Sequence, residues 1–202
     1  MGKQKLNDYF TAIQSENKNL FVPYIVAGDG GLDKLQERID FLEACGVAAI
    51  ELGIPFSDPV ADGPTIQKAG LRALERGTTL AKVINILERS KRERKVPIIL
   101  MTYINPIFAY DVEKFALDCE RVGVDGVIIP DVPMEEEDLI ANYLDKHDIA
   151  FIRLAALTSG PNRLKEIAAR SEGFLYAVSV TGTTGARTTY EEKVYHYLEE
   201  LK

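Results

Sequence analysis

The chain of 202 residues, with 46% hydrophobic and 27% charged side chains, is long enough for one domain built around a single apolar core. Its 24 basic and 31 acidic residues give a net charge of −7, which would repel the phosphate backbone of a nucleic acid. No apolar stretch approaches the roughly 20 residues needed to cross a bilayer, and the N-terminus lacks the apolar segment of a signal peptide. These features argue against nucleic-acid and membrane partners and predict a cytoplasmic protein, with residues 1–202 as a single domain.

Short apolar segments rich in valine and isoleucine recur along the chain and predict six strands. They span residues 21–26, 48–54, 98–103, 126–129, 150–154 and 174–180. Segments with helical spacing of apolar residues separate them, and another, residues 6–13, precedes the first strand, where it could cover the bottom of a barrel. Alternation of apolar strands with helices is typical of a parallel sheet, because each parallel connection needs a crossover. The sequence therefore predicts the α/β class.

Two glycines, Gly46 and Gly123, each follow a predicted helix and lead into a strand, a position suited to the left-handed conformation. This repetition favours a parallel (β/α) TIM barrel. A doubly wound sheet is the alternative, but the usual Gly-rich dinucleotide turn is missing after the first strand, which leads into residues 27–31, AGDGG. A TIM barrel has eight units and typically about 250 residues. We therefore expect the first six of eight units, in a domain incomplete at the C-terminus.

Metal chemistry is not expected from this sequence. The two histidines, His147 and His196, and the two cysteines, Cys45 and Cys119, lie far apart along the chain. Zinc sites usually combine such residues at close spacing. The sequence therefore predicts no metal site.

Glu51 is the first candidate for acid–base chemistry. In the second predicted strand it shares a face with Ala49 and Gly53, opposite Ile50 and Leu52, which places it inside the barrel. A buried carboxylate loses hydration, which raises its pKa and allows it to give and take protons near neutral pH. A structural glutamate paired with a basic side chain is the alternative interpretation.

The segment after this strand, residues 55–67 with the sequence PFSDPVADGPTIQ, is a long loop on the face where barrel enzymes hold their active sites. Pro64 is suited to the first turn of a helix that ends the loop. Asp58 and Asp62 are either functional carboxylates or acceptors for backbone N–H groups in turns and helix caps. Their spacing alone does not decide between these roles.

Residues 51–67, ELGIPFSDPVADGPTIQ, resemble the signature of the tryptophan synthase α subunit family. Supporting matches lie at residues 21–24 (FVPY), 101–106 (MTYINP), 130–133 (PDVP) and 181–186 (TGTTGA). The resemblance covers essentially the whole chain. It implies a lyase of tryptophan biosynthesis that cleaves indole-3-glycerol phosphate to indole and glyceraldehyde 3-phosphate by a retro-aldol reaction, with no metal or organic cofactor in this subunit.

The resemblance also assigns roles to individual residues. It implies that Glu51 transfers protons and that Asp62 stabilises positive charge at the indole nitrogen. Thr184 and Gly185 match a lid loop that closes over the substrate. The substrate-binding positions implied by the resemblance are Tyr24, Met101, Tyr103, Pro130, Leu154, Tyr176, Thr184 and Gly185.

A protein partner follows from the same resemblance. Family members bind a tryptophan synthase β subunit in an α2β2 heterotetramer, and that β subunit carries pyridoxal phosphate and receives indole through a tunnel. Pro55, Asp58 and Asn105 match positions at this interface. Composition and spacing do not reveal this partner independently.

The sequence departs from the family pattern in three places. Gly30 and Leu157 stand where the family commonly has proline, which predicts altered loops after the first and fifth strands. The sequence ends at Lys202, before the units that bind phosphate in the family, so no phosphate site is assigned and weak or no lyase activity is expected. Two alternatives stay open: a non-catalytic fragment that only binds the β subunit, and a related phosphosugar barrel isomerase that uses Glu51 as a base.

Overall fold

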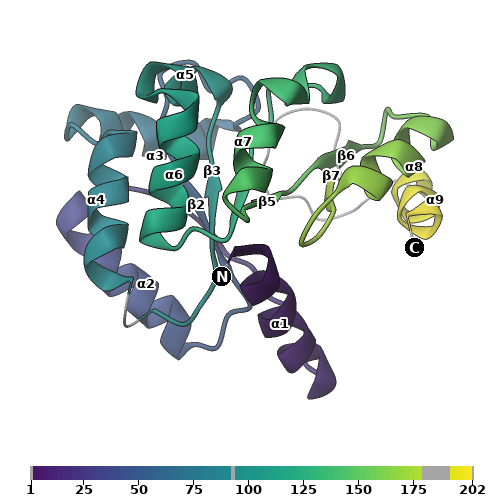
Figure 1. Cartoon of the computed structure of the whole chain (residues 1–202), viewed down its shortest axis with the longest axis horizontal. Helices are drawn as coiled ribbons and strands as arrows, with labels where there is room; N and C mark the ends of the chain where they lie inside the picture. The colour runs from purple at the N-terminus through teal and green to yellow at the C-terminus, as the bar shows by residue number, and fades with distance from the viewer. Residues whose placement is uncertain (1, 92–93, 179–191, 202) are drawn as a thin grey trace.

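The computed structural model describes residues 2–91, 94–178 and 192–201, and its strands form two parallel sheets (Figure 1). The larger sheet has the strand order β1-β2-β3-β4-β5, which follows the sequence, and the smaller sheet pairs β6 with β7. This sequential parallel order, with helices in the crossovers, confirms the predicted α/β class and agrees with part of a barrel. The strands are β1 (Tyr24–Val26), β2 (Ile50–Gly53), β3 (Ile98–Met101), β4 (Gly126–Ile128), β5 (Ala150–Phe151), β6 (Leu154–Ala156) and β7 (Tyr176–Val178).

The helices lie mainly along the outer face of the larger sheet, where α2, α4, α6 and α7 follow one another (Figure 1). The smaller sheet carries α8 on one side. None of the helices in the described ranges is long and apolar enough to cross a membrane. The helices are α1 (Gly2–Ser15), α2 (Leu35–Ala44), α3 (Pro64–Glu75), α4 (Leu80–Ser90), α5 (Ile104–Tyr110), α6 (Val112–Val122), α7 (Ala141–Lys146), α8 (Pro161–Arg170) and α9 (Glu192–Glu200), with 3-10 helices η1 (Leu32–Lys34) and η2 (Met134–Leu139).

The two faces of the larger sheet pack into two different clusters, as the alternation of side chains along a strand requires. Ile50 and Leu52 join the cluster between the sheet and its covering helices. Ala49 and Ile99 join a second cluster on the opposite, interior face. The strand parity predicted around Glu51 is therefore confirmed.

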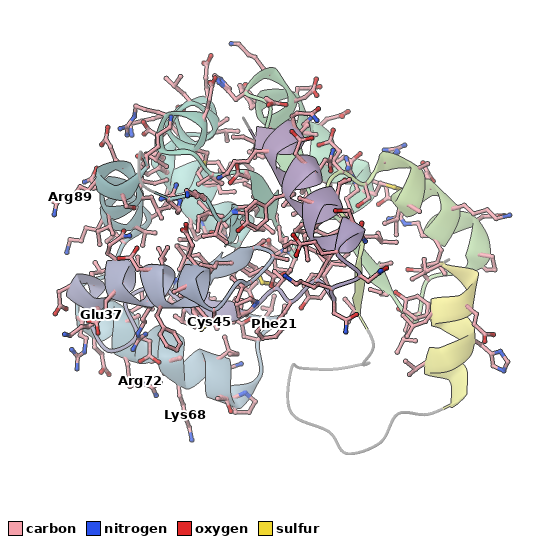
Figure 2. All side chains as sticks on the ribbon, turned by 90° about the horizontal axis from the view of Figure 1, so that it is seen from below. Phe21, Glu37, Cys45, Lys68, Arg72 and Arg89 are labelled. Carbon is pink, nitrogen blue, oxygen red and sulfur yellow. The ribbon has the colours of Figure 1, made fainter. Side chains whose placement is uncertain are left out.

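Helix α1 covers the lower end of the interior face, as Figure 2 shows from below. Leu6 and Phe10 pack into the interior cluster, and the Phe10 ring lies 5.9 Å from the Phe174 ring between centroids. The Lys5 ammonium group also pairs with the buried Asp125 carboxylate at 3.0 Å. The prediction that residues 6–13 form a helix across the bottom is confirmed.

The prediction of one strand over residues 150–154 is wrong. The Ile152 N–H still donates to the Val127 carbonyl at 3.0 Å, which continues the pairing with β4. One residue later, the Arg153 carbonyl accepts from the Tyr176 N–H at 3.0 Å, which begins the pairing with β7. The chain thus changes its neighbour at this point, and the predicted strand divides into β5 and β6.

Several predicted strands are longer than the strands in the structure. The structure assigns only part of each predicted segment to a strand, such as the last three residues of 21–26 and the first four of 98–103, and residues 179–180 of the last predicted strand lie outside the described ranges. Gly46 and Gly123 both have φ of +75°, which confirms the left-handed conformation expected after the helices. Gly30 has φ of +82°, which proline cannot adopt. The loop after β1 therefore follows a path closed to the proline usual in the family.

Candidate active site

Glu51 lies in the middle of β2 with its side chain on the interior face, and the residue is only 5% exposed. Burial raises the pKa of its carboxyl group to about 7. Among the described residues, none donates a hydrogen bond to this carboxylate or forms an ion pair with it. The alternative of a structural glutamate held by a basic side chain is therefore not supported, and the group is suited to exchange protons near neutral pH.

Tyr24 stands beside Glu51, because the two residues are register partners across β1 and β2. Its hydroxyl group lies over Gly53, where an added Cβ atom would come within 2.1 Å of that oxygen. Glycine at position 53 therefore makes room for the Tyr24 ring. Burial raises the pKa of Tyr24, and nearby groups raise it further: Asp62, Tyr103, Glu51 and Tyr176. These electrostatic contacts show that the structure brings the predicted catalytic and aromatic residues together.

Asp62 ends the loop between β2 and α3. Its N–H donates to the Pro59 carbonyl at 3.1 Å, and its own carbonyl accepts from the Gln67 side chain at 2.9 Å. Helix α3 begins at Pro64, as predicted, and no side chain caps its N-terminus. The backbone of Asp62 is therefore fixed while its partly exposed carboxylate is not used as a helix cap.

The electrostatic environment of Asp62 has two opposing components. Burial raises the pKa of its carboxyl group, and a hydrogen bond from the Tyr103 hydroxyl group lowers it. Burial prevails, so the net shift is upward. Partial burial reduces the screening of Asp62 by solvent, so its negative charge acts more strongly on a neighbouring positive charge than it would in bulk water.

Tyr103 follows β3 and connects this strand to the Asp62 loop. Its hydroxyl oxygen accepts a hydrogen bond from the Ala61 N–H at 3.0 Å, and its ring lies 5.4 Å from the Phe56 ring between centroids. Burial raises the pKa of Tyr103 to about 12, so the hydroxyl group keeps its proton at neutral pH. That proton is available for the Asp62 carboxylate, since a hydroxyl group can donate and accept at once.

Asp131, in the loop after β4, stabilises the backbone next to Tyr103. Its two carboxylate oxygens lie 3.0 and 3.3 Å from the Ile104 nitrogen, and they accept from this N–H at the start of α5. Sequence reasoning assigned no role to Asp131, Phe56 or Gly53. A polar residue in the loop that follows a parallel strand was the available signal for Asp131, because the carboxyl ends of neighbouring strands share one edge of the sheet.

A cleft of about 1090 Å³ opens at this edge of the sheet. It contains five of the predicted site residues: Asp62, Met101, Pro130, Leu154 and Tyr176. Glu51, Tyr24 and Tyr103 are not part of its described lining; Glu51 and Tyr103 are buried, and Tyr24 is half-buried. Thr184 and Gly185, and the lid predicted around them, lie outside the described residues.

The three residues predicted at the partner interface differ in exposure. Asp58 and Asn105 are exposed, and the Asp58 carboxylate accepts a hydrogen bond from the Ser57 hydroxyl group at 2.5 Å. Pro55 is buried within the chain, so it has little surface to offer a partner. Their interface role stays a prediction.

Within the described ranges, no three His, Cys, Asp or Glu side chains lie close enough together to hold a metal ion. The His147 ring pairs instead with the Glu120 carboxylate at 2.6 Å, and His196 is exposed.

Comparison with known proteins places these features in one family. The family model described as tryptophan synthase alpha chain matches residues 10–202. The tryptophan synthase alpha chain of Oceanobacillus iheyensis is 60% identical over all 202 residues, which span 77% of that relative, and a Bacillus cereus relative is 48% identical over the same share.

Solved structures agree with these matches. A Mycobacterium tuberculosis tryptophan synthase structure has a TM-score of 0.88 at 30% identity and covers 98% of this chain and 76% of the matched one. The tryptophan synthase a2b2 complex of Pyrococcus furiosus has a TM-score of 0.80 at 38% identity and covers 90% and 73%. With a matching family model, high identity over its full length and the barrel-type sheet of these structures, the chain belongs to the tryptophan synthase alpha chain family.

Proposed function

We propose that this chain cleaves indole-3-glycerol phosphate to indole and glyceraldehyde 3-phosphate, with Glu51 and Asp62 as its catalytic carboxylates. The observation that carries the proposal is the Glu51 carboxyl group, which is buried on the interior face with a pKa of about 7. A group with that pKa is present in both protonation states at neutral pH. The reaction itself is inferred from membership of the tryptophan synthase alpha chain family.

The reaction breaks the bond between indole C3 and the first carbon of the glycerol phosphate side chain. A proton is added to C3, and the ring becomes a cation with its positive charge at nitrogen. The hydroxyl group on the first side-chain carbon then loses its proton as the carbon–carbon bond breaks and the aldehyde forms. The electron pair of the broken bond returns to the ring, and indole leaves.

In the proposed mechanism Glu51 moves the protons, because it can both give and take them at neutral pH. Asp62 faces the ring N–H as a carboxylate and stabilises the cation electrostatically. The hydroxyl group of Tyr103 supports this role, because its hydrogen bond lowers the pKa of Asp62 and so favours the charged form.

The indole ring is proposed to bind in the cleft between the ends of the strands. Met101, Pro130, Leu154 and Tyr176 give this cleft an apolar, partly aromatic wall. A flat apolar ring binds well to such a surface, with a few polar groups to orient it. Tyr24 and Tyr103 complete the aromatic surroundings of the carboxylates, and Thr184 and Gly185 are proposed for the lid.

The reaction uses no cofactor in this subunit, and pyridoxal phosphate belongs to the β subunit of the α2β2 complex. Asp58 and Asn105 are exposed and available for that β subunit. A cytoplasmic location is proposed, in keeping with this biosynthetic role.

The test is indole release from indole-3-glycerol phosphate. It is run on this chain and on a version extended with the C-terminal part of the Oceanobacillus iheyensis relative. Glu51→Gln and Asp62→Asn are compared with Glu37→Gln and Asp40→Asn, which change the same groups on the exposed side of α2. For the chain as it stands we expect weak or no turnover. In the extended version we expect both site variants to lose at least about 100-fold in turnover, as is common for acid–base and electrostatic groups, and both controls to keep the wild-type rate.

Two results would contradict the proposal. Turnover that survives Glu51→Gln in the extended version would remove Glu51 from the mechanism. Activation of a β subunit by both forms, with indole release by neither, would assign the chain a binding role instead.

A further inference from the structure

The larger and smaller sheets separate between Ile152 and Arg153, and the cleft is lined from both sides of this split. The loop after β4 forms one side of it, with Ile129 and Pro130 in the lining. Strand β6 forms the other side, with Leu154 and Ala156 in the lining. Among the described residues, no backbone hydrogen bond joins β4 to β6, so no sheet pairing fixes the width of the cleft.

Arg153 occupies the point where the chain passes from one sheet to the other. Its Nε atom donates to the Glu137 carboxylate at 2.7 Å, and its Nη1 atom donates to the carbonyls of Phe151, at 3.3 Å, and Arg170. The guanidinium group also lies over the Phe151 ring, 4.7 Å from its centroid. Its side chain is only 13% exposed.

Glu137 joins Arg153 to a third segment. This residue lies in η2, which follows the β4 loop, and its second carboxylate oxygen accepts from Arg170 at the end of α8 at 2.9 Å. The side chain of Glu137 is 9% exposed and that of Arg170 is 45% exposed, so salt and water screen the bond to Arg153 less than the bond to Arg170. Glu137, Arg153 and Arg170, here called the clamp, therefore connect the β4 side of the split to β6 and α8.

We propose that the clamp sets the width of the substrate cleft, with Arg153 as its positioning residue. The clamp bridges the two sides where backbone pairing is absent, and it holds β6 and β7 at a fixed distance from the ends of β3 and β4. Leu154 and Tyr176 are thereby presented to Met101 and Pro130 across the cleft. The inference rests on the proposed function, because it takes this cleft as the indole site.

The chain offers a matched control two residues away. Glu135 also lies in η2 and pairs with Arg163 of α8, so it joins the same two helices as the clamp. Its side chain is 63% exposed, whereas that of Glu137 is 9% exposed. An exposed pair of this kind contributes little to stability. Glu137→Gln and Glu135→Gln are thus the same chemical change in a buried and an exposed bridge.

The first measurement is backbone hydrogen exchange over β6 and β7 in wild type, Arg153→Met, Glu137→Gln and Glu135→Gln. We expect exchange at least tenfold faster in the two clamp variants and unchanged in Glu135→Gln. The second is the affinity for indole, measured by calorimetry on the same proteins. We expect it to be at least threefold weaker in the clamp variants and unchanged in the control.

Each outcome bears on a separate part of the inference. Wild-type exchange rates in both clamp variants would show that the clamp does not hold the two sheets together. Faster exchange with unchanged indole affinity would show that the clamp does not set the width of the substrate cleft. If wild type binds no indole, the proposed function fails, while the exchange rates still decide whether the clamp holds the two sheets. If Arg153→Met does not fold, Arg153→Lys, which keeps the charge but loses the forked geometry, is judged by the same two measurements.

Discussion

The hydroxyl oxygen of Tyr103 accepts a hydrogen bond from the backbone N–H of Ala61 at 3.0 Å. This contact ties the end of β3 to the residue before Asp62, so two segments that are 42 positions apart in sequence hold one carboxylate. Asp131 fixes the next residue after Tyr103 through the Ile104 N–H. The Asp62 loop is therefore anchored to the ends of β3 and β4.

Replacing Tyr103 with phenylalanine tests this anchor. Tyr103→Phe keeps the ring but leaves the Ala61 N–H without its acceptor, at a cost of about 1 kcal/mol in the free energy of unfolding. It also removes the hydrogen bond that lowers the pKa of Asp62, so the acidic limb of the kcat/KM profile should move to higher pH. Tyr143→Phe, on an exposed side chain, is the control. An acidic limb at the same pH in all three proteins would show that Tyr103 does not tune Asp62.

The buried carboxyl group of Glu51 predicts an unusual dependence of stability on pH. Its pKa rises from 4.5 to about 7 on folding, so the folded chain holds more protons than the unfolded chain between these values. Its contribution to stability therefore falls as pH rises through this window, by about 3 kcal/mol in all. Glu51→Gln has no such proton, and its stability relative to wild type should increase from pH 5 to pH 8.

Urea denaturation at the two pH values measures this difference, with Glu37→Gln as the control on the exposed face of α2 (Figure 2). If the difference in the free energy of unfolding between wild type and Glu51→Gln is the same at both pH values, the Glu51 pKa does not change on folding.

Asp118 predicts the opposite dependence at acid pH. Burial raises the pKa of its carboxyl group, but hydrogen bonds from Lys114, Tyr110 and Arg121 outweigh burial and bring it to about 2. A carboxylate with a lowered pKa stabilises the fold above its unfolded pKa, and this stabilisation is lost as pH falls toward 2. Asp118→Asn should therefore cost about 1 kcal/mol at pH 7, a value reduced by solvent screening, and almost nothing at pH 2.

The control for Asp118 is Glu113→Gln, whose ion pair with Lys146 is exposed on both sides. Urea denaturation at pH 7 and at pH 2 measures the free energy of unfolding of both variants, and only the cost of Asp118→Asn should depend on pH. An equal effect of Asp118→Asn at both pH values would rule out the titration as its cause.

Features that depend on local periodicity were predictable from the sequence. The side of β2 on which Glu51 lies follows from its alternation with Ile50 and Leu52, and its burial and raised pKa follow from that side. The start of α3 at Pro64 follows from the preference of proline for the first helical turn. These properties need no knowledge of distant partners.

Features that depend on distant partners were not predictable in this way. The division of the strand at Arg153 arises because Ile152 bonds to Val127 and Arg153 to Tyr176, and neither partner is encoded in the apolar run itself. The support of Ile104 by Asp131 likewise joins residues 27 positions apart. The catalytic interpretation of Asp62 came from the family motif around it, since its spacing also fitted an ordinary turn.

The pH dependence of indole release from indole-3-glycerol phosphate tests the central role of Glu51 most directly. For the version extended with the C-terminal part of the Oceanobacillus iheyensis relative, measured from pH 5 to 9, we predict an inflection in kcat/KM near the Glu51 pKa of about 7. In Glu51→Gln the rate should fall at least about 100-fold and lose this inflection, because the exchanging proton is gone. A Glu51→Gln variant that keeps both the wild-type rate and the inflection would contradict the account.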